Sequence, residues 1–520
     1  MISRLMTGAA ALAVTAGMAA AEYKLHVVHI NDLHSRIEPI NKYDSTCKAE
    51  DNAEGKCFGG YARVATKIAE LRAQLADENL IVLDAGDQYQ GSLMYTTYKG
   101  DVEIEMAEKV GFDAMAVGNH EFDDGPEGLL KLIEGVSFPV ISGNLDVSKS
   151  NVLAGKVQNH VVLEVGGEKI GIISALATDT AETSSPGEAV IFQDEIQSLQ
   201  ADVDALTAEG VTKIIALNHV GVKKDMEIAE AVKGVDAVVG GHSHTKFSNT
   251  EEGAMAYPTM VGGVPVVQAY AYSKYVGHLV LTFDDEGNVT SATGDTILLD
   301  ASVAEDPEIV ARVAELAGPI DEMKNRVVAE AAEAIDGERG SCRAMECAMG
   351  NLVADAMLDR VKDQGIQIAI QNGGGLRASI DAGEITMGEV LTVLPFQNTL
   401  STFEVTGEAI VAALENGVSK HEEGAGRFAQ VAGMTYAFDV TRPVGSRVSD
   451  VMVGGEPIEL GKVYGVVSNN YVRNGGDGYK MFRAAQNAYD FGPDLADVTA
   501  EYLAANGPFK PMLDGRITAK

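Results

Sequence analysis

The segment AVGNHEFDDG, residues 116–125, joins an apolar run to an unusually dense group of polar side chains. The run stops at Gly118, and four side chains capable of chemistry follow almost at once: Asn119, His120, Glu121 and Asp123. Buried polar groups need partners, because leaving one unsatisfied costs free energy. The segment therefore predicts a buried strand that ends at a functional site.

Similar apolar runs recur along the first three hundred residues and alternate with helical patterns. The runs are LHVVHI (25–30), LIVLDAG (80–86), AMAVG (114–118), PVISG (139–143), KIIALN (213–218) and DAVVGG (236–241). Short apolar runs bounded by turn residues indicate buried strands, and strand–helix alternation indicates a layered α/β domain with a largely parallel sheet. Residues 265–299 are expected to complete this domain as hairpins.

Five of these strands are followed by carboxylate, amide or imidazole side chains. The residues are Asn31, Asp32 and His34; Asp87; Asn119 and His120; His219; and His242 and His244. Open α/β sheets place ligand sites at the carboxyl ends of their strands. We therefore expect these side chains to meet at one edge of the sheet.

The length of 520 residues favours at least two domains, since one hydrophobic core rarely grows so large. Residues 302–334 are rich in charge and helical in pattern, and predict a connecting helix. A second, smaller α/β domain follows, with Gly-rich loops at 371–377 and 474–478. The predicted division is 1–21, 22–304, a linker helix at 305–335, and 336–520.

The first residues, MISRLMTGAAALAVTAGMAAAEYK, carry a positive charge, a short apolar stretch and then small residues. This pattern is typical of a secretory signal peptide, with cleavage after Ala21. A membrane anchor is the weaker interpretation, because the stretch is short and Gly/Ala-rich and no second one follows. The mature chain is expected to be periplasmic or secreted, without a membrane anchor.

Four cysteines fit an oxidising compartment. Three pairings are possible, but closing short loops costs the least chain entropy. We therefore predict disulfides Cys47–Cys57 and Cys342–Cys347. Free thiols or a zinc site are less favoured, because the spacings are not CxxC.

The formal net charge of −36 argues against a nucleic-acid polymer as partner, since polyanion binding needs a basic surface. A small anionic substrate stays possible where local cations override the overall field.

The ordered blocks D-x-H, GD, GNHE, H and GHxH resemble the calcineurin-like metallophosphoesterase family, and each follows a predicted strand. The resemblance implies a four-layer domain, with two sheets flanked by helices, that binds two divalent ions. It assigns Asp32, His34, Asp87 and His244 to one ion, and Asp87, Asn119, His219 and His242 to the other. Imidazole and carboxylate donors suit zinc, with manganese, cobalt or magnesium as alternatives. Two bridged ions would polarise a phosphoryl group and lower the pKa of a bound water.

The same resemblance gives His120 and Asp123 the role of a catalytic dyad, in which the carboxylate orients the imidazole. The imidazole would stabilise charge on the phosphoryl group or the leaving oxygen. A structural histidine bonded to Asp123 is the alternative. Glu121 receives no role, and Asp84 is expected to support its loop.

Four blocks in the second half are Arg- or Gly-rich and carry two aromatic rings. They are DGERGSCRAMECAMGNLVADAM (336–357), IQNGGGLRASI (370–380), GRFAQVAGM (426–434) and NNYVRNGGDGY (469–479). Together with LDAGDQYQGS and GNHEFDDG they resemble the 5′-nucleotidase family from about residue 24 to about 490. In that family the second domain rotates between open and closed forms, so the linker helix is a candidate hinge.

The resemblance implies a substrate site in the second domain. Phe428 and Tyr471 would stack on the nucleobase, Asp477 would bind ribose hydroxyls, and Arg343, Arg377 and Asn372 would hold the phosphate, with Arg339 as a further phosphate contact. An exposed aromatic ring is often ordinary surface, and Arg343 could simply pair with an acidic neighbour.

We predict a metal-dependent 5′-nucleotidase that uses a metal-bound hydroxide to cleave nucleoside 5′-monophosphates such as AMP to nucleoside and phosphate. Alternatives are a UDP-sugar or dinucleotide hydrolase, or a 2′,3′-cyclic phosphodiesterase with 3′-nucleotidase activity. A catalytically silent nucleotide-binding protein is the alternative of another class. The oligomeric state, monomer or homodimer, stays open.

Overall fold

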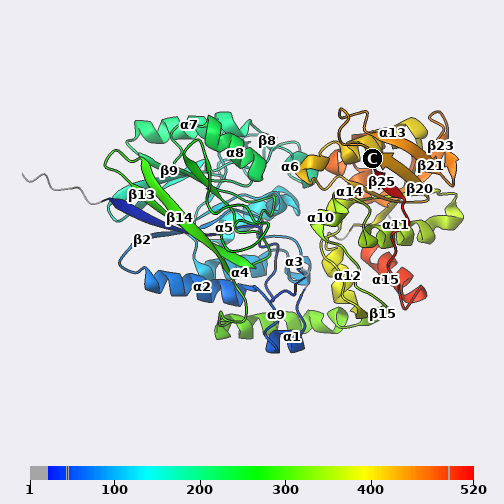
Figure 1. Cartoon of the computed structure of the whole chain (residues 1–520), viewed down its shortest axis with the longest axis horizontal. Coiled ribbons are helices and arrows are strands. Elements are labelled where there is room, and N and C mark those ends of the chain that lie inside the picture. The colour runs from blue at the N-terminus through cyan, green and yellow to red at the C-terminus, as the bar shows by residue number, and fades with distance from the viewer. Residues whose placement is uncertain (1–21, 43, 45, 397, 490–491) are drawn as a thin grey trace, which may run out of the picture.

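The computed structural model describes residues 22–42, 44, 46–396, 398–489 and 492–520. The predicted signal peptide, residues 1–21, lies outside the described residues. The chain forms two lobes side by side, connected along one side by helix α9 (Pro307–Lys324) (Figure 1). Among the described residues, no helix is both long and apolar enough to cross a bilayer.

The first lobe contains two six-stranded sheets. The first has the order β14 (Val289–Leu298), β13 (Tyr275–Phe283), β1 (Tyr23–Ile30), β2 (Asn79–Asp84), β3 (Ala114–Ala116) and β4 (Val140–Ile141). The second has the order β11 (Thr259–Val261), β12 (Val264–Val267), β10 (Ala237–Val239), β9 (Lys213–Leu217), β7 (Glu168–Ile173) and β6 (His160–Val165). Strands β1 to β4 run parallel, as do β7, β9, β10 and β12.

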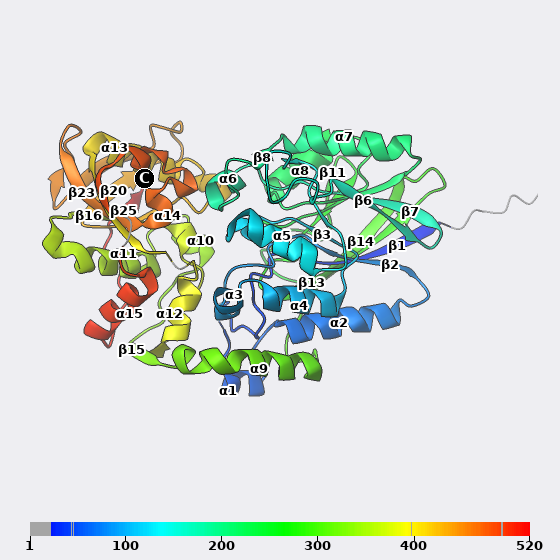
Figure 2. The same cartoon turned by 180° about the vertical axis from the view of Figure 1, so that it is seen from behind.

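Alternating side chains place each sheet between two hydrophobic layers. In β1, Leu25 and Val27 enter the core between the sheets, whereas Val28 and Ile30 face the opposite side. The first sheet is covered there by α2 (Tyr61–Gln74), α4 (Asp101–Val110) and α5 (Gly125–Gly135). The second is covered by α7 (Glu195–Ala208) and α8 (Val222–Ala231). The expected four layers, two sheets flanked by helices, are confirmed (Figure 2).

The expected hairpins are present, and they complete both sheets. Strands β13 and β14 form an antiparallel hairpin on the edge of the first sheet. Strand β12 forms a hairpin with β11 and joins the second sheet beside β10. Strands β6 and β7 were not expected from the sequence, and they extend the second sheet next to β9.

Helix α9 begins where the Asp306 side chain accepts hydrogen bonds from the backbone N–H groups of Glu308 and Ile309. The prediction of a helix through residue 335 is wrong, because α9 ends at Lys324. Residues Val327–Ala331 instead form β15, which pairs with β17 (Gly383–Thr386) in the second lobe. The β-branched pair Val327-Val328 suits a strand, and this long-range pairing overrides the local helical pattern.

The second lobe is a smaller α/β unit, as expected. Its main sheet has the order β19 (Ala429–Ala432), β16 (Ile368–Asn372), β23 (Val463–Asn469), β18 (Leu400–Thr406) and β24 (Gln486–Tyr489). Helices α11 (Ala348–Val361) and α15 (Leu495–Ala505) pack on one side, and α13 (Gly407–Val418) on the other. A second sheet contains β22 (Glu456–Pro457), β21 (Val448–Val453), β20 (Met434–Phe438) and β25 (Ile517–Ala519).

Short elements complete the chain. They are α1 (Ala49–Ala53), α3 (Leu93–Tyr98), β5 (Leu145–Asp146), α6 (Thr180–Thr183), β8 (Ile191–Phe192), α10 (Arg339–Cys342), α12 (Met387–Val393) and α14 (Asn470–Arg473). Both predicted disulfides, Cys47–Cys57 and Cys342–Cys347, are present.

Candidate active site

A cavity of about 890 Å³ lies between the two lobes. The first lobe lines it with side chains that follow its parallel strands, and the second with its Arg- and Gly-rich loops. Six of the cavity residues illustrate this division: Asp87, Asn119 and His120 from the first lobe, and Arg343, Arg377 and Asp477 from the second. The strand ends therefore meet at one place, as the sequence predicts.

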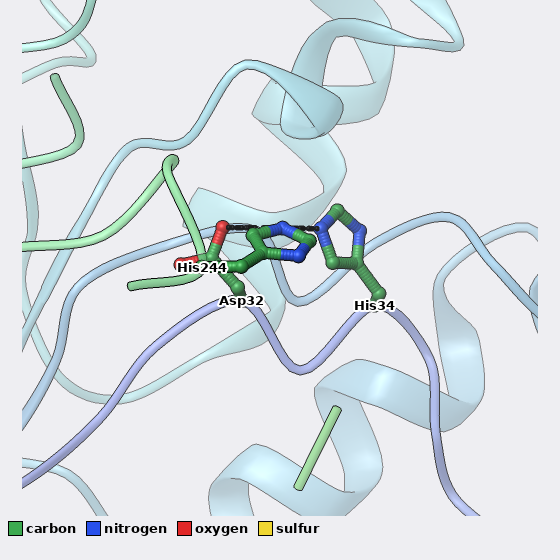
Figure 3. Close-up of side chains that lie close together, drawn as sticks. All are labelled: Asp32, His34 and His244. Atoms are coloured by element: carbon green, nitrogen blue, oxygen red, sulfur yellow. Dashed lines mark hydrogen bonds and ion pairs between the residues drawn. The ribbon is translucent and has the colours of Figure 1, made fainter. Parts of the chain in front are cut away.

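Asp32, His34 and His244 form the first candidate metal group (Figure 3). The Nε2 atoms of His34 and His244 lie 2.9 Å apart, and His244 Nε2 lies 3.1 Å from Asp32 Oδ1. The loop after β1 supplies two of these side chains, and the loop after β10 supplies the third. Their donor atoms converge on a volume that a single ion could occupy.

The remaining predicted ligands lie beside this group. Asp87 Oδ2 is 3.1 Å from His219 Nε2, and Asn119 Oδ1 is 2.8 Å from His242 Nδ1. His219 Nδ1 lies 2.7 Å from the carbonyl oxygen of Ala85. A proton on Nδ1 satisfies that carbonyl, so Nε2 is the nitrogen available to bind an ion beside Asp87.

Five of the seven predicted ligands have positive φ values, a left-handed conformation that L-residues adopt at a cost. They are Asp32, His34, Asp87, His242 and His244, with φ between 51° and 71°. Main-chain hydrogen bonds from Asp32 to Gly86 and from His34 to Asp87, both 2.9 Å, hold the first two loops together. Strained residues of this kind persist only where the surrounding structure fixes them.

The residues present fit divalent ions. Burial, together with nearby arginines, lowers the pKa of His34 and His244 well below the usual range, and burial lowers that of His242 to about 3. Burial opposes charge on His219, but Asp87 and Asp32 outweigh it and raise its pKa to about 10. His34, His242 and His244 are therefore neutral imidazoles, and the carboxylates beside His219 attract positive charge. Imidazole and carboxylate donors of this kind suit zinc-like ions.

His120 and Asp123 form the predicted dyad. His120 Nδ1 lies 2.7 Å from Asp123 Oδ2, and Ser184, a residue that the sequence did not suggest, donates its hydroxyl to Asp123 Oδ1 at 2.7 Å. Burial opposes charge on the imidazole, but Asp123 and Asp87 outweigh it and raise the pKa of His120. Donor atoms of His120, His34 and Asp87 also lie within 4.8 Å of one another, so the dyad borders the metal groups.

Two further acids support the loops. Asp84 accepts hydrogen bonds from the Gly86 N–H at 3.1 Å and from the Gln88 side chain, as expected. Glu121 is fully buried and accepts hydrogen bonds from the backbone N–H groups of Asp87, which follows β2, and of Gly118, which follows β3.

Three arginines of the second lobe reach the cavity, and none has an acidic partner in the part of the chain that the structure describes. Arg377 Nη2 lies 3.4 Å from His34 Nε2, and Arg339 Nη2 donates to the His242 carbonyl at 3.4 Å. Arg343 Nη1 donates to the Gly424 carbonyl at 3.5 Å. Within the described residues none of the three forms an ion pair, and burial followed by mutual repulsion lowers the pKa of Arg343. Such a cluster is suited to an anion.

Asn372, Tyr471 and Asp477 lie together on the same wall of the cavity. Asn372 Nδ2 donates to Asp477 Oδ2 at 2.7 Å, and the Tyr471 hydroxyl donates to Asp477 Oδ1 at 3.3 Å. The three predicted side chains therefore form one polar cluster.

Phe428, predicted to stack on the base, does not line the cavity in this structure. Its ring is fully buried in the second lobe, where it packs 5.6 Å from the Phe438 ring and 6.0 Å from His421. Phe396 does line the cavity, with its ring 6.0 Å from that of His120 and 5.7 Å from the Arg377 guanidinium. The segment LPF at 394–396, just beyond α12, gave the only sequence signal for it.

Comparisons with known proteins agree with this geometry. Residues 25–246 match the family model described as calcineurin-like phosphoesterase, and residues 327–484 match that of the 5′-nucleotidase C-terminal domain. The second match begins at residue 327, which is also the first residue of β15, the strand that pairs with β17 in the second lobe.

Full-length relatives cover both lobes. The chain is 40% identical to a 5′-nucleotidase of Diplobatis ommata, over 96% of this chain and 90% of that protein. It is 37% identical to the human 5′-nucleotidase, over 96% and 91% of the two chains. The crystal structure of a 5′-nucleotidase precursor from Thermus thermophilus superposes with a TM-score of 0.90 at 40% identity, covering 96% of this chain and 99% of that one. The chain belongs to the 5′-nucleotidase family.

Proposed function

We propose that this chain hydrolyses nucleoside 5′-monophosphates, such as AMP, to nucleoside and phosphate in the cavity between its lobes. One observation carries the proposal. A cluster of carboxylates and imidazoles faces three arginines that have no acidic partner among the described residues, across a single cavity. The first wall suits cations and the second suits an anion, so a phosphate monoester is complementary to the pair.

Asp32, His34, Asp87 and His244 would hold one divalent ion, and Asp87, Asn119, His219 and His242 the other. When bound, these ions would supply Lewis acidity to the phosphoryl group and to the attacking water. Zinc is the proposed metal because the donors are imidazole and carboxylate, and manganese, cobalt and magnesium are alternatives.

His120 would act on the substrate through Nε2. Its Nδ1 faces Asp123, whose other oxygen accepts the Ser184 hydroxyl, so Nε2 is the ring nitrogen left for the substrate. Raised basicity keeps a proton available on the imidazole. From this position Nε2–H would donate to a phosphoryl oxygen or to the departing 5′-oxygen.

The second lobe would bind the nucleotide. Arg343 and Arg377, with Arg339 and Asn372, would surround the phosphate, because guanidinium forks match phosphate oxygens in geometry and charge. The Tyr471 ring and the Phe396 ring would stack on the base, and Asp477 would accept from ribose hydroxyls.

The proposed setting is the periplasm or the extracellular space. Two disulfides support it, because such bonds persist in oxidising compartments.

A substrate panel tests the activity. The chelator-treated chain is compared with the ion-reconstituted chain on 5′-AMP, 3′-AMP and UDP-glucose, with products identified by chromatography. We expect ion-dependent phosphate release from 5′-AMP in preference to the others. Preferred cleavage of 3′-AMP or UDP-glucose would assign one of the alternative hydrolase activities, and nucleotide binding without turnover would assign a silent binding protein.

A further inference from the structure

Glu121 is a fully buried carboxylate for which the proposed chemistry has no use. Its Oε2 accepts hydrogen bonds from the backbone N–H groups of Gly118 at 2.7 Å and Asp87 at 3.0 Å. Its Oε1 accepts from those of Gln88 at 2.9 Å and Tyr89 at 3.2 Å. One side chain therefore satisfies four main-chain donors that no helix or sheet pairs.

These donors belong to two segments that follow neighbouring strands. Residues 87–89 follow β2 and include Asp87, the ligand proposed to bridge both ions. Gly118 follows β3 and precedes Asn119, a proposed ligand of one ion. The His120 N–H donates to Asp87 Oδ1 at 2.9 Å, which joins the same two segments a second time. Glu121 thus connects two parts of the metal centre.

Gly118 shows how closely the segments approach. A Cβ atom at this position would lie 2.4 Å from the Asp87 backbone nitrogen and 2.3 Å from its Oδ1. Any other residue would therefore push the two segments apart. The left-handed φ of 60° at Asp87 adds a local cost that fixed hydrogen bonds must offset.

The hydrogen-bond geometry around residue 121 also requires a side chain that only accepts hydrogen bonds. All four contacts of this carboxyl group among the described residues are with N–H donors, two on each oxygen. A glutamine of the same shape would turn an NH₂ group against one of these donor pairs. An isosteric change should therefore disturb the centre, because a buried donor facing a donor is left unsatisfied.

We propose that Glu121 is a positioning residue, which holds the Asp87 loop and the Asn119–His120 turn at the separation that the ions require. This inference rests on the two-ion centre of the proposed function. Outer groups that orient metal ligands typically contribute about 10- to 100-fold to metal affinity. The loss on neutralising Glu121 should appear in ion affinity first and in turnover as a consequence.

Equilibrium dialysis with Zn²⁺ tests the inference on the full chain after chelator treatment. We expect wild type to bind two ions and Glu121→Gln to bind at least one of them about 10- to 100-fold more weakly. Excess Zn²⁺ should restore much of the kcat of the variant, with KM for 5′-AMP unchanged. A purely structural role would lower the thermal stability of the ion-free chain and leave the affinity unaltered.

Glu127→Gln is the matched control, because Glu127 is an exposed acid on the adjacent helix α5. It removes the same charge and should bind both ions as wild type does. Two tight sites in Glu121→Gln would overturn the inference. If Glu121→Gln does not fold, Glu121→Asp replaces it, because the shorter aspartate side chain can reach only some of the four N–H donors. Wild-type zinc affinity in Glu121→Asp would also overturn the inference. Wild type that binds no ion would instead overturn the metal centre itself.

Discussion

The two walls of the cavity carry side chains suited to ions of opposite charge. The first-lobe wall gathers carboxylates and imidazoles on loops tied to one another by main-chain hydrogen bonds, such as His34 to Asp87. The second-lobe wall gathers arginines whose hydrogen bonds, among the described residues, are with single carbonyl oxygens or with a first-lobe histidine. One wall attracts cations, and the other attracts an anion.

The difference shows how a chain of net charge −36 can select an anionic substrate. The overall field repels phosphate, so the attraction must come from charges placed within a few ångströms. Arginines do this on the second wall, and bound ions would do it on the first. If so, substitutions on the first wall should abolish the chemistry, whereas those on the second should mainly weaken binding.

Asp87→Asn should have the largest effect. The change removes the carboxylate proposed to bridge both ions, so we expect kcat to fall by at least about 10⁴-fold. Steady-state assays with 5′-AMP, alongside ion content by atomic absorption, measure this. A variant that kept two ions and near-normal kcat would remove Asp87 from the bridging role.

His120→Ala should come next, with kcat lower by about 10³-fold, because a positioned proton donor typically contributes about 10²- to 10⁴-fold. The ion content should stay at the wild-type level, since the ring is not a proposed ligand. Loss of an ion from this variant would mean that His120 belongs to the metal centre.

Arg377→Ala should reduce kcat/KM by about 10²-fold, because it removes a buried donor to the phosphate charge. Inhibition by inorganic phosphate should weaken in parallel. Arg312→Ala serves as the control, since Arg312 lies on the surface and pairs with Glu105. An equal loss in both variants would trace the effect to something other than the cavity.

Phe396→Ala should raise KM for 5′-AMP by about tenfold with little change in kcat, since stacking on a base is worth about 1–3 kcal/mol. Phe428→Ala should instead lower the melting temperature, because emptying a buried phenylalanine site costs about 3–5 kcal/mol. The two variants separate a ring on the cavity from a ring in the core. A raised KM in Phe428→Ala, with only a lowered melting temperature in Phe396→Ala, would assign Phe428 to the base site.

Lys420→Ala should have the smallest effect. Lys420 Nζ pairs with Asp179 Oδ2 at 3.0 Å across the two lobes, and partly exposed pairs contribute about 0.2–1 kcal/mol. KM should rise by no more than about fivefold at low salt, and the difference should vanish at high salt. Lys462→Ala, at an exposed pair within the second lobe, should leave KM unaltered at either salt concentration.

The sequence predicted the first wall better than the second, for a physical reason. A polar residue after a buried strand has few explanations besides a site, so Asp32, Asp87 and His219 were identifiable from position and residue type. A phenylalanine fits both a core and a binding surface, so Phe428 and Phe396 could not be told apart. Only burial distinguishes them.

Features that depend on long-range partners could not be predicted. Ser184 acts on Asp123 from a distant loop, and Glu121 binds main-chain groups, which leave no pattern in the side-chain sequence. Similarly, Val327–Ala331 became a strand only because β17 lies beside it. Propensity is a weak guide where such pairing dominates.

The left-handed backbone of five proposed ligands limits how this chain can vary. At about 1–2 kcal/mol each, these conformations together cost about 5–10 kcal/mol, which is comparable with the whole net stability of a typical domain. Packing in the two sheets that carry these loops must offset this free-energy cost. Amino-acid replacements should therefore be tolerated on the outer, solvent-facing helices and rejected in the strands that support the loops.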